Sequence, residues 1–241
     1  MTRVMAVNGS PRMERGDTEM LLAAFLDGMR EAGAETETVY PSRLKIRPCD
    51  CGEMRCWFKR PGECHHADDM RDLYGRLSQA EIVVLATPVY VPLPGDMQHF
   101  LNRLTPLLDP TVRTRDGRTR ARLRSHVQIK KFALVSTGGW WEKENFGSVV
   151  RIVQELAENA GVEFAGPVLR PHASVMKRDD ELTPDGRSVL RAAALAGREL
   201  IENGSIRGAT LEEVGRPLIS RQVYDRWFNQ SVAAAGDETD R

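Results

Sequence analysis

The chain has 241 residues, and its 34 basic and 34 acidic side chains give a formal net charge of zero. This length suits one large domain, or one domain with extensions, that buries a sizeable core. A neutral chain lacks the basic face that general binding of nucleic acid or of an anionic membrane requires, so neither class of partner is expected.

Short apolar segments alternate with helical patterns along the chain. Strands are predicted at residues 3–7, 37–40, 82–86, 132–135 and 162–165, the last with a continuation at 168–169. Helices with one apolar face are predicted at residues 18–32, 69–79, 95–104, 146–160 and 185–203. This alternation predicts an α/β fold: a doubly wound, five-stranded parallel sheet with helices on both faces. Ligands of such sheets bind beyond the carboxyl ends of the strands, so the loops there are the candidate site.

The loop after the first strand reads NGSPRMERGDT. It has no Gly-Lys-Ser/Thr and no Gly-x-Gly-x-x-Gly, so it is neither a Walker A loop nor a dinucleotide fingerprint. It offers the hydroxyls of Ser10 and Thr18, the guanidinium of Arg12 and the free N–H groups of a helix start. A helix N-terminus suits a phosphate. The alternative is that Asp17 or Thr18 simply caps the helix.

The loops after the third and fourth strands read TPVYVPLP and STGGWW. In the first, Tyr90 stands among prolines and offers a firm wall for a flat ring. In the second, Thr137 is followed by Gly138 and Gly139, which let the backbone approach a ligand closely. The alternatives are a hydrophobic loop that packs on its neighbour, and tryptophans at a subunit contact. A phosphate at the first loop and a flat heterocycle between the other two indicate FMN.

The segments NGSPR…GDT, DDM, AEIVVLATPVY, MQHFLNRL and STGG occur in this order along the chain. Together they resemble the NADPH-dependent FMN reductase and iron–sulfur flavoprotein branch of the flavodoxin-like superfamily. The resemblance covers roughly residues 3–205, and the tail RPLISRQVYDRWFNQ is similar to the C-termini of that family. It implies a flavodoxin-like FMN-binding domain at 1–205, with a cysteine-containing loop at 41–68, and a C-terminal extension at 206–241.

The resemblance also implies which residues bind the cofactor. On the phosphate side they are Ser10, Arg12, Asp17 and Thr18. Around the isoalloxazine ring they are Pro88, Val89, Tyr90, Thr137, Gly138 and Gly139. Asp17 stands where the family commonly has Asn, which puts a carboxylate near the expected phosphate.

The four cysteines are Cys49, Cys51, Cys56 and Cys64, which read C-x-C-x4-C-x7-C. Four thiolates so close in sequence suit a [4Fe–4S] cluster or a zinc ion, and His65 and His66 are candidates to replace one of them. Iron–sulfur flavoproteins have C-x2-C-x2-C followed by a longer gap, so the last gap here fits and the first two differ. The other interpretation, which we favour at this point, is a loop that covers the flavin site and holds no metal.

Two segments bear on assembly and location. The basic run VRTRDGRTRARLR at 112–124 predicts a solvated loop or an oligomer contact. With the tryptophan pair it leads us to expect a homodimer or homotetramer. Residues 1–7 contain no apolar signal segment, and the longest apolar window, 82–93, is short and interrupted by prolines. We expect a soluble cytoplasmic protein that has no membrane association and no structural disulfides.

The resemblance implies an NAD(P)H-dependent FMN oxidoreductase. A nicotinamide cofactor would reduce the flavin, which would pass electrons to a quinone, a flavin or another small acceptor. The flavin would carry the redox chemistry, so no catalytic side chain is expected. The alternatives are an electron carrier with FMN and a [4Fe–4S] cluster that serves protein partners, and a regulator that binds FMN or metal without catalysis.

Overall fold

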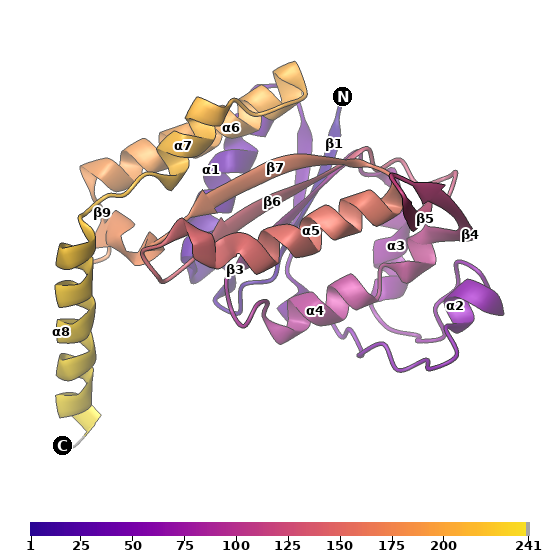
Figure 1. The fold of residues 1–241 in the computed structure, drawn as a ribbon, viewed down its shortest axis with the longest axis horizontal. Helices are drawn as coiled ribbons and strands as arrows, with labels where there is room; N and C mark the ends of the chain where they lie inside the picture. The colour runs from indigo at the N-terminus through magenta and orange to yellow at the C-terminus, as the bar shows by residue number, and fades with distance from the viewer. Residues whose placement is uncertain (240–241) are drawn as a thin grey trace.

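The computed structural model describes residues 1–239 (Figure 1). Its main sheet has five parallel strands in the order β2-β1-β3-β6-β7. Their bounds are β1 Arg3–Asn8, β2 Glu35–Val39, β3 Ile82–Pro88, β6 Lys131–Thr137 and β7 Glu163–Arg170. Counted along the sheet, this is the 2-1-3-4-5 order of flavodoxin-like folds, so the predicted fold class is confirmed.

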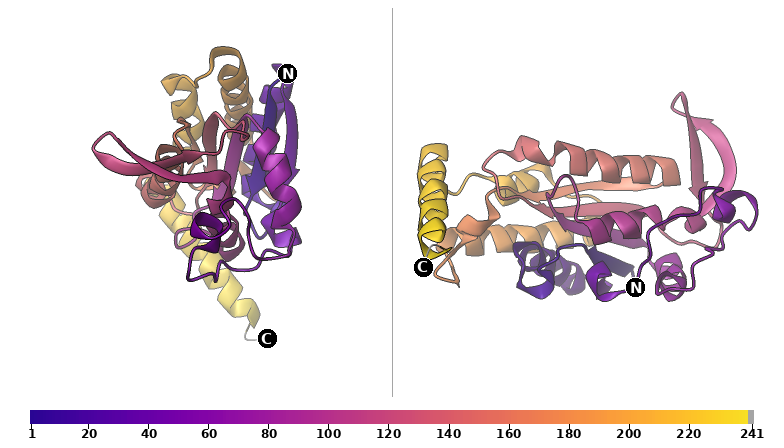
Figure 2. Two further views of the ribbon diagram at one scale, coloured as in Figure 1. Left: turned by 90° about the vertical axis from the view of Figure 1, so that its right-hand side faces the viewer. Right: turned by 90° about the horizontal axis from the view of Figure 1, so that it is seen from below.

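Helices cover both faces of the sheet (Figures 1 and 2). The two layers have separate cores because successive side chains of a strand point to opposite faces. In β1, Val4 and Ala6 join one core, and Met5 and Val7 join the other. The first core lies under α1 (Asp17–Glu31), α6 (Pro184–Asn203) and α7 (Gly208–Gly215). The second lies under α3 (Met70–Gln79), α4 (Gly95–Asn102) and α5 (Gly147–Ala160).

Several elements lie outside the sequence prediction. They are the hairpins β4 (Leu108–Arg115) with β5 (Arg118–Leu123) and β8 (Lys177–Arg178) with β9 (Glu181–Leu182), and the helices α2 (Arg55–Phe58), α7 and α8 (Arg221–Thr239). Short 3-10 helices are η1 (Met13–Arg15), η2 (Pro41–Arg43), η3 (Thr105–Leu107), η4 (Lys143–Phe146) and η5 (Ala173–Met176). In Figure 1, α8 projects from the end of the molecule to which the arrow of β7 points.

The basic run at 112–124 forms most of the β4–β5 hairpin, so the prediction of a loop there is wrong. The hairpin packs on α5 through ion pairs within the chain. Arg118 and Arg120 each pair with Glu155 and Glu158 at 2.9–3.3 Å. Two arginines of this strand therefore have partners on a neighbouring helix, and this part of the basic run makes a structural contact.

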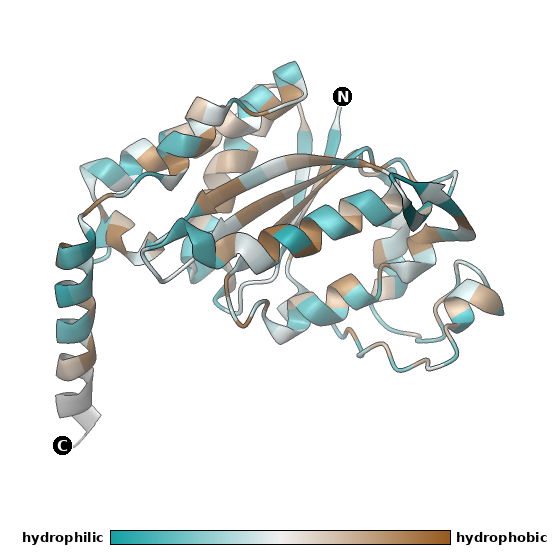
Figure 3. Ribbon diagram, in the orientation of Figure 1, coloured by the Kyte–Doolittle hydropathy of each residue, from teal (hydrophilic) through white to brown (hydrophobic). Residues whose placement is uncertain are grey.

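The hydropathy of the chain follows its layers. In Figure 3 the central strands are coloured as hydrophobic, and the helices around them carry mixed colours. Among the residues that the structure describes, no helix combines the length and the apolar character needed to cross a membrane.

Candidate functional site

Three loops meet where β1, β3 and β6 end. We call residues 9–16 loop one, residues 89–94 loop three and residues 138–142 loop four. Backbone hydrogen bonds extend the sheet into them: Gly9 N donates to Ala86 O, and Val89 N donates to Thr137 O, both at 2.8 Å. The side chains of Thr18 and Thr137 are buried and hydrogen-bonded to each other, with 2.7 Å between their Oγ1 atoms. The start of α1 is thus fixed directly beside loop four.

The N-terminus of α1 has the features of an anion site. Its N-cap is Gly16, and no side chain caps the helix. A Cβ at Gly16 would lie 3.0 Å from Ser10 Oγ, so loop one folds tightly against the helix start. Ser10 is buried, its N–H donates to Asn8 Oδ1 at 2.9 Å, and its hydroxyl accepts from Arg12 N at 3.3 Å. Loop one therefore presents the positive end of a 15-residue helix in a fixed conformation, which suits a phosphate.

Arg12 and Asp17 form an ion pair on this loop. Arg12 Nη2 lies 2.8 Å from Asp17 Oδ2, and the arginine side chain is 66% exposed. The arginine end of the pair is exposed, so the guanidinium has room to turn toward a bound anion. The carboxylate of Asp17 contacts Arg12, which makes Asp17 a partner of the arginine in this structure.

Loop three presents an aromatic side chain. Pro88 and Val89 are half-buried, whereas Tyr90 is 65% exposed. The backbone N–H of Val89 donates to Thr137 O, and that of Tyr90 donates to Pro92 O. These two amides are used inside the protein, so the Tyr90 ring is the group that loop three offers to a flat ligand.

Loop four has open space at its second glycine. Gly138 is fixed on both sides, because its N–H donates to Arg170 O and its carbonyl accepts from Ala173 N, both at 3.0 Å. A Cβ built on Gly139 meets no heavy atom within 4 Å. Its carbonyl accepts a hydrogen bond from the Tyr224 hydroxyl at 2.5 Å. A planar ring can therefore approach the backbone at Gly139 without displacing a side chain.

The Trp pair of loop four divides between two environments. Trp141 is stacked with His172 at 6.2 Å between ring centroids, and its Nε1 donates to Ile219 O at 3.1 Å. Trp140 is 56% exposed, with Phe228 of α8 at 5.5 Å between centroids. Trp141 therefore packs within the chain, and Trp140 remains available at the surface.

The pairing of two buried basic residues beneath loop four was not predicted from the sequence. Arg170 and His172 are fully buried, and Arg170 Nη2 lies 2.8 Å from His172 Nε2. His172 Nε2 also accepts from Leu218 N at 3.1 Å, so the imidazole is neutral with its proton on Nδ1. Burial and then Arg170 lower the pKa of His172 to about 4. The available signal was the Arg-Pro-His sequence after the last strand.

The four cysteines lie close to one another. Burial and then the neighbouring Cys51 and Cys64 raise the pKa of Cys49. Burial and then the charges of the other three thiols raise the pKa of Cys56 to about 11. A zinc ion would need sulfurs about 3.8 Å apart. In the described chain no three cysteine sulfurs lie within 4.8 Å of one another, so the thiols do not form a ready-made zinc site. A [4Fe–4S] cluster spreads its thiolates more widely, and the gathered thiols suit that donor set.

The thiols and the three loops lie in different parts of the molecule. Helix α2, which carries Cys56, contacts β4 and η3. Figure 1 shows α2 beside the β4–β5 hairpin, at the opposite end of the sheet from α8. The expectation that the cysteine-containing part of this loop covers the flavin site is therefore wrong within one chain. Only the start of the segment approaches the site, where Arg43 pairs with Glu14 of η1 at 2.6 Å.

Comparison with known proteins gives a family match and several relatives. The model of the family described as NADPH-dependent FMN reductase matches residues 2–164. An iron-sulfur flavoprotein of Archaeoglobus fulgidus is 35% identical over 106 residues, which cover 43% of this chain and 46% of the relative. The chain spans about half the length of the curated relatives it matches.

Solved structures share the fold. The NAD(P)H:quinone oxidoreductase from Methanothermobacter marburgensis superposes with a TM-score of 0.58 at 16% identity, covering 83% of this chain and 98% of that one. An FMN-dependent NADH-azoreductase from Bacillus anthracis in complex with FMN gives 0.54 at 13% identity, covering 84% and 97%. At these identities the likeness supports the flavodoxin-like architecture alone.

Proposed function

Because the chain belongs to the NADPH-dependent FMN reductase family, we propose that it is an FMN-dependent NAD(P)H oxidoreductase. Electrons would pass from the nicotinamide through the flavin to a small acceptor such as a quinone, a free flavin, or a nitro- or azo-aromatic compound. The name of the A. fulgidus flavoprotein supports flavin chemistry.

The observation that carries this proposal is the Thr18–Thr137 hydrogen bond of 2.7 Å. It joins the loop suited to an anion to the loop suited to a ring. A ligand that has a phosphate at one end and a flat heterocycle at the other would contact both loops at once. FMN has this form.

The residues of the chain would hold the cofactor and leave the redox chemistry to it. Bound FMN supplies the transfer of a hydride or of single electrons. Ser10, Arg12 and the first amides of α1 would bind its phosphate, with Thr18 fixing the helix start and Asp17 holding Arg12 nearby. The ring would lie among the segments that resemble family ring-binding segments, namely Pro88, Val89, Tyr90, Thr137, Gly138 and Gly139.

The proposal is tested on protein loaded with FMN under anaerobic conditions. Mixing with NADPH or NADH should bleach the flavin absorption, and a quinone should then restore it over many turnovers. A flavin that neither nucleotide reduces would contradict the proposal.

A matched pair of variants tests the location of the ring. A Cβ at either Gly139 or Gly75 meets no atom within 4 Å, so Gly139→Leu and Gly75→Leu should both fold. Gly139→Leu fills the space beside loop four and should lose FMN binding, whereas Gly75→Leu on α3 should bind FMN like the wild type. Equal FMN binding by the two variants would place the ring elsewhere.

The gathered thiols favour a second candidate, an electron carrier with FMN and a [4Fe–4S] cluster. The matched curated relatives are named iron-sulfur flavoproteins. In this case, protein purified without oxygen would hold about four iron and four sulfide per chain. Both would be lost when the four cysteines are changed to serine. In the wild-type protein, a reduced ferredoxin would reduce the flavin, whereas NADH and NADPH would not. Less than one equivalent of iron would count against this candidate.

A further inference from the structure

Two short segments, residues 45–50 of the cysteine-containing loop and residues 64–69 at its end, run side by side. Asp69 Oδ2 accepts from Lys45 N at 2.7 Å, and Asp68 Oδ2 accepts from Arg47 N at 2.9 Å. Asp68 is also held by the buried Arg103 through two hydrogen bonds of 2.7 and 2.9 Å. The segments are therefore linked to each other and to the body of the protein, which gives a firm base for side chains that meet between them.

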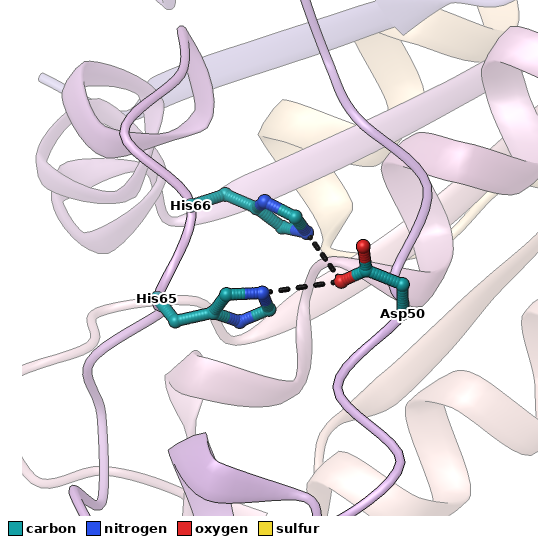
Figure 4. Close-up of side chains that lie close together, drawn as sticks. All are labelled: Asp50, His65 and His66. Atoms are coloured by element: carbon teal, nitrogen blue, oxygen red, sulfur yellow. Dashed lines mark ion pairs between the residues drawn. The ribbon is translucent and has the colours of Figure 1, made fainter.

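Asp50, His65 and His66 meet between these segments (Figure 4). In Figure 4 both imidazoles point across the gap toward one carboxylate oxygen. Asp50 Oδ1 lies 3.1 Å from His65 Nε2 and 2.9 Å from His66 Nε2. Potential ligand atoms of the three residues all lie within 4.8 Å of one another.

These spacings match the edges of a metal coordination shell. With metal–ligand bonds of about 2.1 Å, neighbouring ligand atoms lie about 3.0 Å apart in an octahedron and about 3.4 Å apart in a tetrahedron. The two measured contacts fall near these values. An ion would therefore bind with small rotations of side chains that already converge.

The donor set selects the kind of ion. Two imidazole nitrogens and one carboxylate oxygen suit Zn²⁺ and neighbouring transition metals, whereas Mg²⁺ and Ca²⁺ prefer oxygen ligands alone. His66 is buried, with its side chain 4% exposed, while the Asp50 side chain is 62% exposed. Water can therefore complete the shell on the Asp50 side. We propose that Asp50, His65 and His66 form a binding site for a divalent transition metal of the Zn²⁺ class.

This site is separate from the thiols, although it shares the same loop. Cys49 and Cys51 flank Asp50 in the sequence, and Cys64 precedes His65. The thiols interact with one another, and in the described chain no sulfur belongs to the group formed by the aspartate and the histidines. The loop thus carries a nitrogen and oxygen donor set beside a sulfur donor set, and the two sets are expected to prefer different metals.

Cobalt distinguishes the two sets by its spectrum. Co²⁺ is titrated without oxygen into chelator-treated full-length protein that carries no polyhistidine tag. Bound to nitrogen and oxygen, Co²⁺ shows weak visible bands, whereas thiolate ligands add intense near-ultraviolet charge-transfer absorption. We expect the weak bands alone at the first equivalent, and Zn²⁺ should displace the cobalt.

Matched variants assign the ligands. The double variant His65→Ala/His66→Ala should weaken Co²⁺ binding by more than about 100-fold, since loss of mere outer-shell partners already costs 10- to 100-fold. Asp50→Asn keeps the size of an exposed side chain and should also weaken binding. His126→Ala, which removes an exposed histidine elsewhere, should bind like the wild type. Circular dichroism checks that each variant is folded.

Three results would overturn the proposal. In the first, wild-type protein binds neither Co²⁺ nor Zn²⁺, and the three residues are then a hydrogen-bonded network alone. In the second, the first equivalent shows thiolate charge transfer that disappears when the cysteines become serine and persists in the double histidine variant. In the third, folded Asp50→Asn and double histidine variants both bind cobalt with wild-type affinity.

Discussion

Arg12 is the charged side chain of loop one that is best placed to meet a phosphate. Its guanidinium is largely exposed and is held near the start of α1 by Asp17. A hydrogen bond to a charged group contributes about 1.5–3 kcal/mol. We therefore expect Arg12→Ala to weaken FMN binding by about 10- to 150-fold, because each 1.4 kcal/mol is about a factor of ten. Titration of apo-protein, followed by flavin fluorescence, measures the change.

Riboflavin is the control for this variant, because it has the ring and lacks the phosphate. Arg12→Ala should leave riboflavin binding unchanged. Equal losses for FMN and riboflavin would mean that loop one supports the fold alone. Asp17→Asn tests whether Asp17 only holds Arg12 or binds the cofactor itself. If Asp17 only holds Arg12, FMN should bind to the variant as tightly as to the wild type, or more tightly. If the Asp17 carboxylate binds the cofactor, FMN should bind more weakly.

His172 links pH to stability. An unperturbed histidine side chain has a pKa of about 6.5. In the folded chain, burial and then Arg170 lower the pKa of His172 to about 4. The unfolded chain therefore binds more protons between these values, and the folded chain loses stability as the pH falls from about 6.5 toward 4. Above this window the contribution of His172 is fully present.

The expected loss between pH 7 and pH 5 is about 2 kcal/mol of unfolding free energy from this group. Urea unfolding at the two pH values measures it. His172→Gln, which does not titrate, should lack this part of the loss, whereas His126→Gln, at an exposed position, should keep it. If His172→Gln loses as much stability between the two pH values as the wild type, the pKa of His172 is not lowered in the folded chain, and this prediction is wrong.

At the scale of elements, the apolar periodicity located the five sheet strands and the covering helices except α7, because burial against a sheet face produces a regular apolar pattern in the sequence. It missed elements whose conformation depends on polar contacts. The last strand was predicted in two pieces because Gly166 and Pro167 interrupt it, yet β7 runs on to Arg170 with an irregular register beside β6. The β4–β5 hairpin was missed because its arginines hide its strand character, and their carboxylate partners lie on α5.

Arg115 of this hairpin closes the end of α5. Its Nη2 donates to the carbonyls of Glu158 at 2.6 Å and Asn159 at 3.2 Å, where the helix ends before Gly161. A cation at a helix C-terminus is favourable, and these carbonyls have no partner inside the helix. We expect Arg115→Ala to lower the unfolding free energy by about 1–2 kcal/mol. Arg113→Ala, on an exposed position of the same strand, should change it little, and equal effects in urea unfolding would contradict this role.

The candidate site shows the same division between what the sequence predicts and what it leaves open. Strand ends placed the loops of Ser10, Tyr90 and Gly139 at one edge of the sheet. Contacts across 119 residues, such as the one between Thr18 and Thr137, have no local pattern. The sequence also did not predict that α8 contacts loop four, because the Tyr224 hydroxyl donates to the carbonyl of Gly139, which lies 85 residues earlier in the chain.

At the scale of the whole molecule, two parts of the segment after residue 205 contact the rest of the protein in different places. Its first part, with α7, packs on α6 and β7, and Val214 is fully buried. The carbonyls of Val214 and Arg216 accept hydrogen bonds of 2.9 Å from the buried Arg170. Its second part, α8, projects from the body and touches loop four through Tyr224. We propose that the two parts serve stability and the flavin site, respectively.

Two truncations test this division. A chain that ends at residue 205 loses the burial of Val214, about 1.5–3 kcal/mol, and the two hydrogen bonds of the Arg170 guanidinium to carbonyls, about 1.5–3 kcal/mol each. Total stabilities of about 5–15 kcal/mol make such a loss large, so the 1–205 chain should melt far below the full chain or fail to fold.

A chain that ends at residue 219 keeps α7 and both carbonyls and should melt near the full chain. It lacks Tyr224, so loop four loses its support at Gly139 and FMN should bind more weakly. Melting followed by circular dichroism and FMN titration separate the two effects. Equal melting of the 1–205 and 1–219 chains would show that α7 is dispensable, and wild-type FMN affinity in the 1–219 chain would show that α8 has no part in the flavin site.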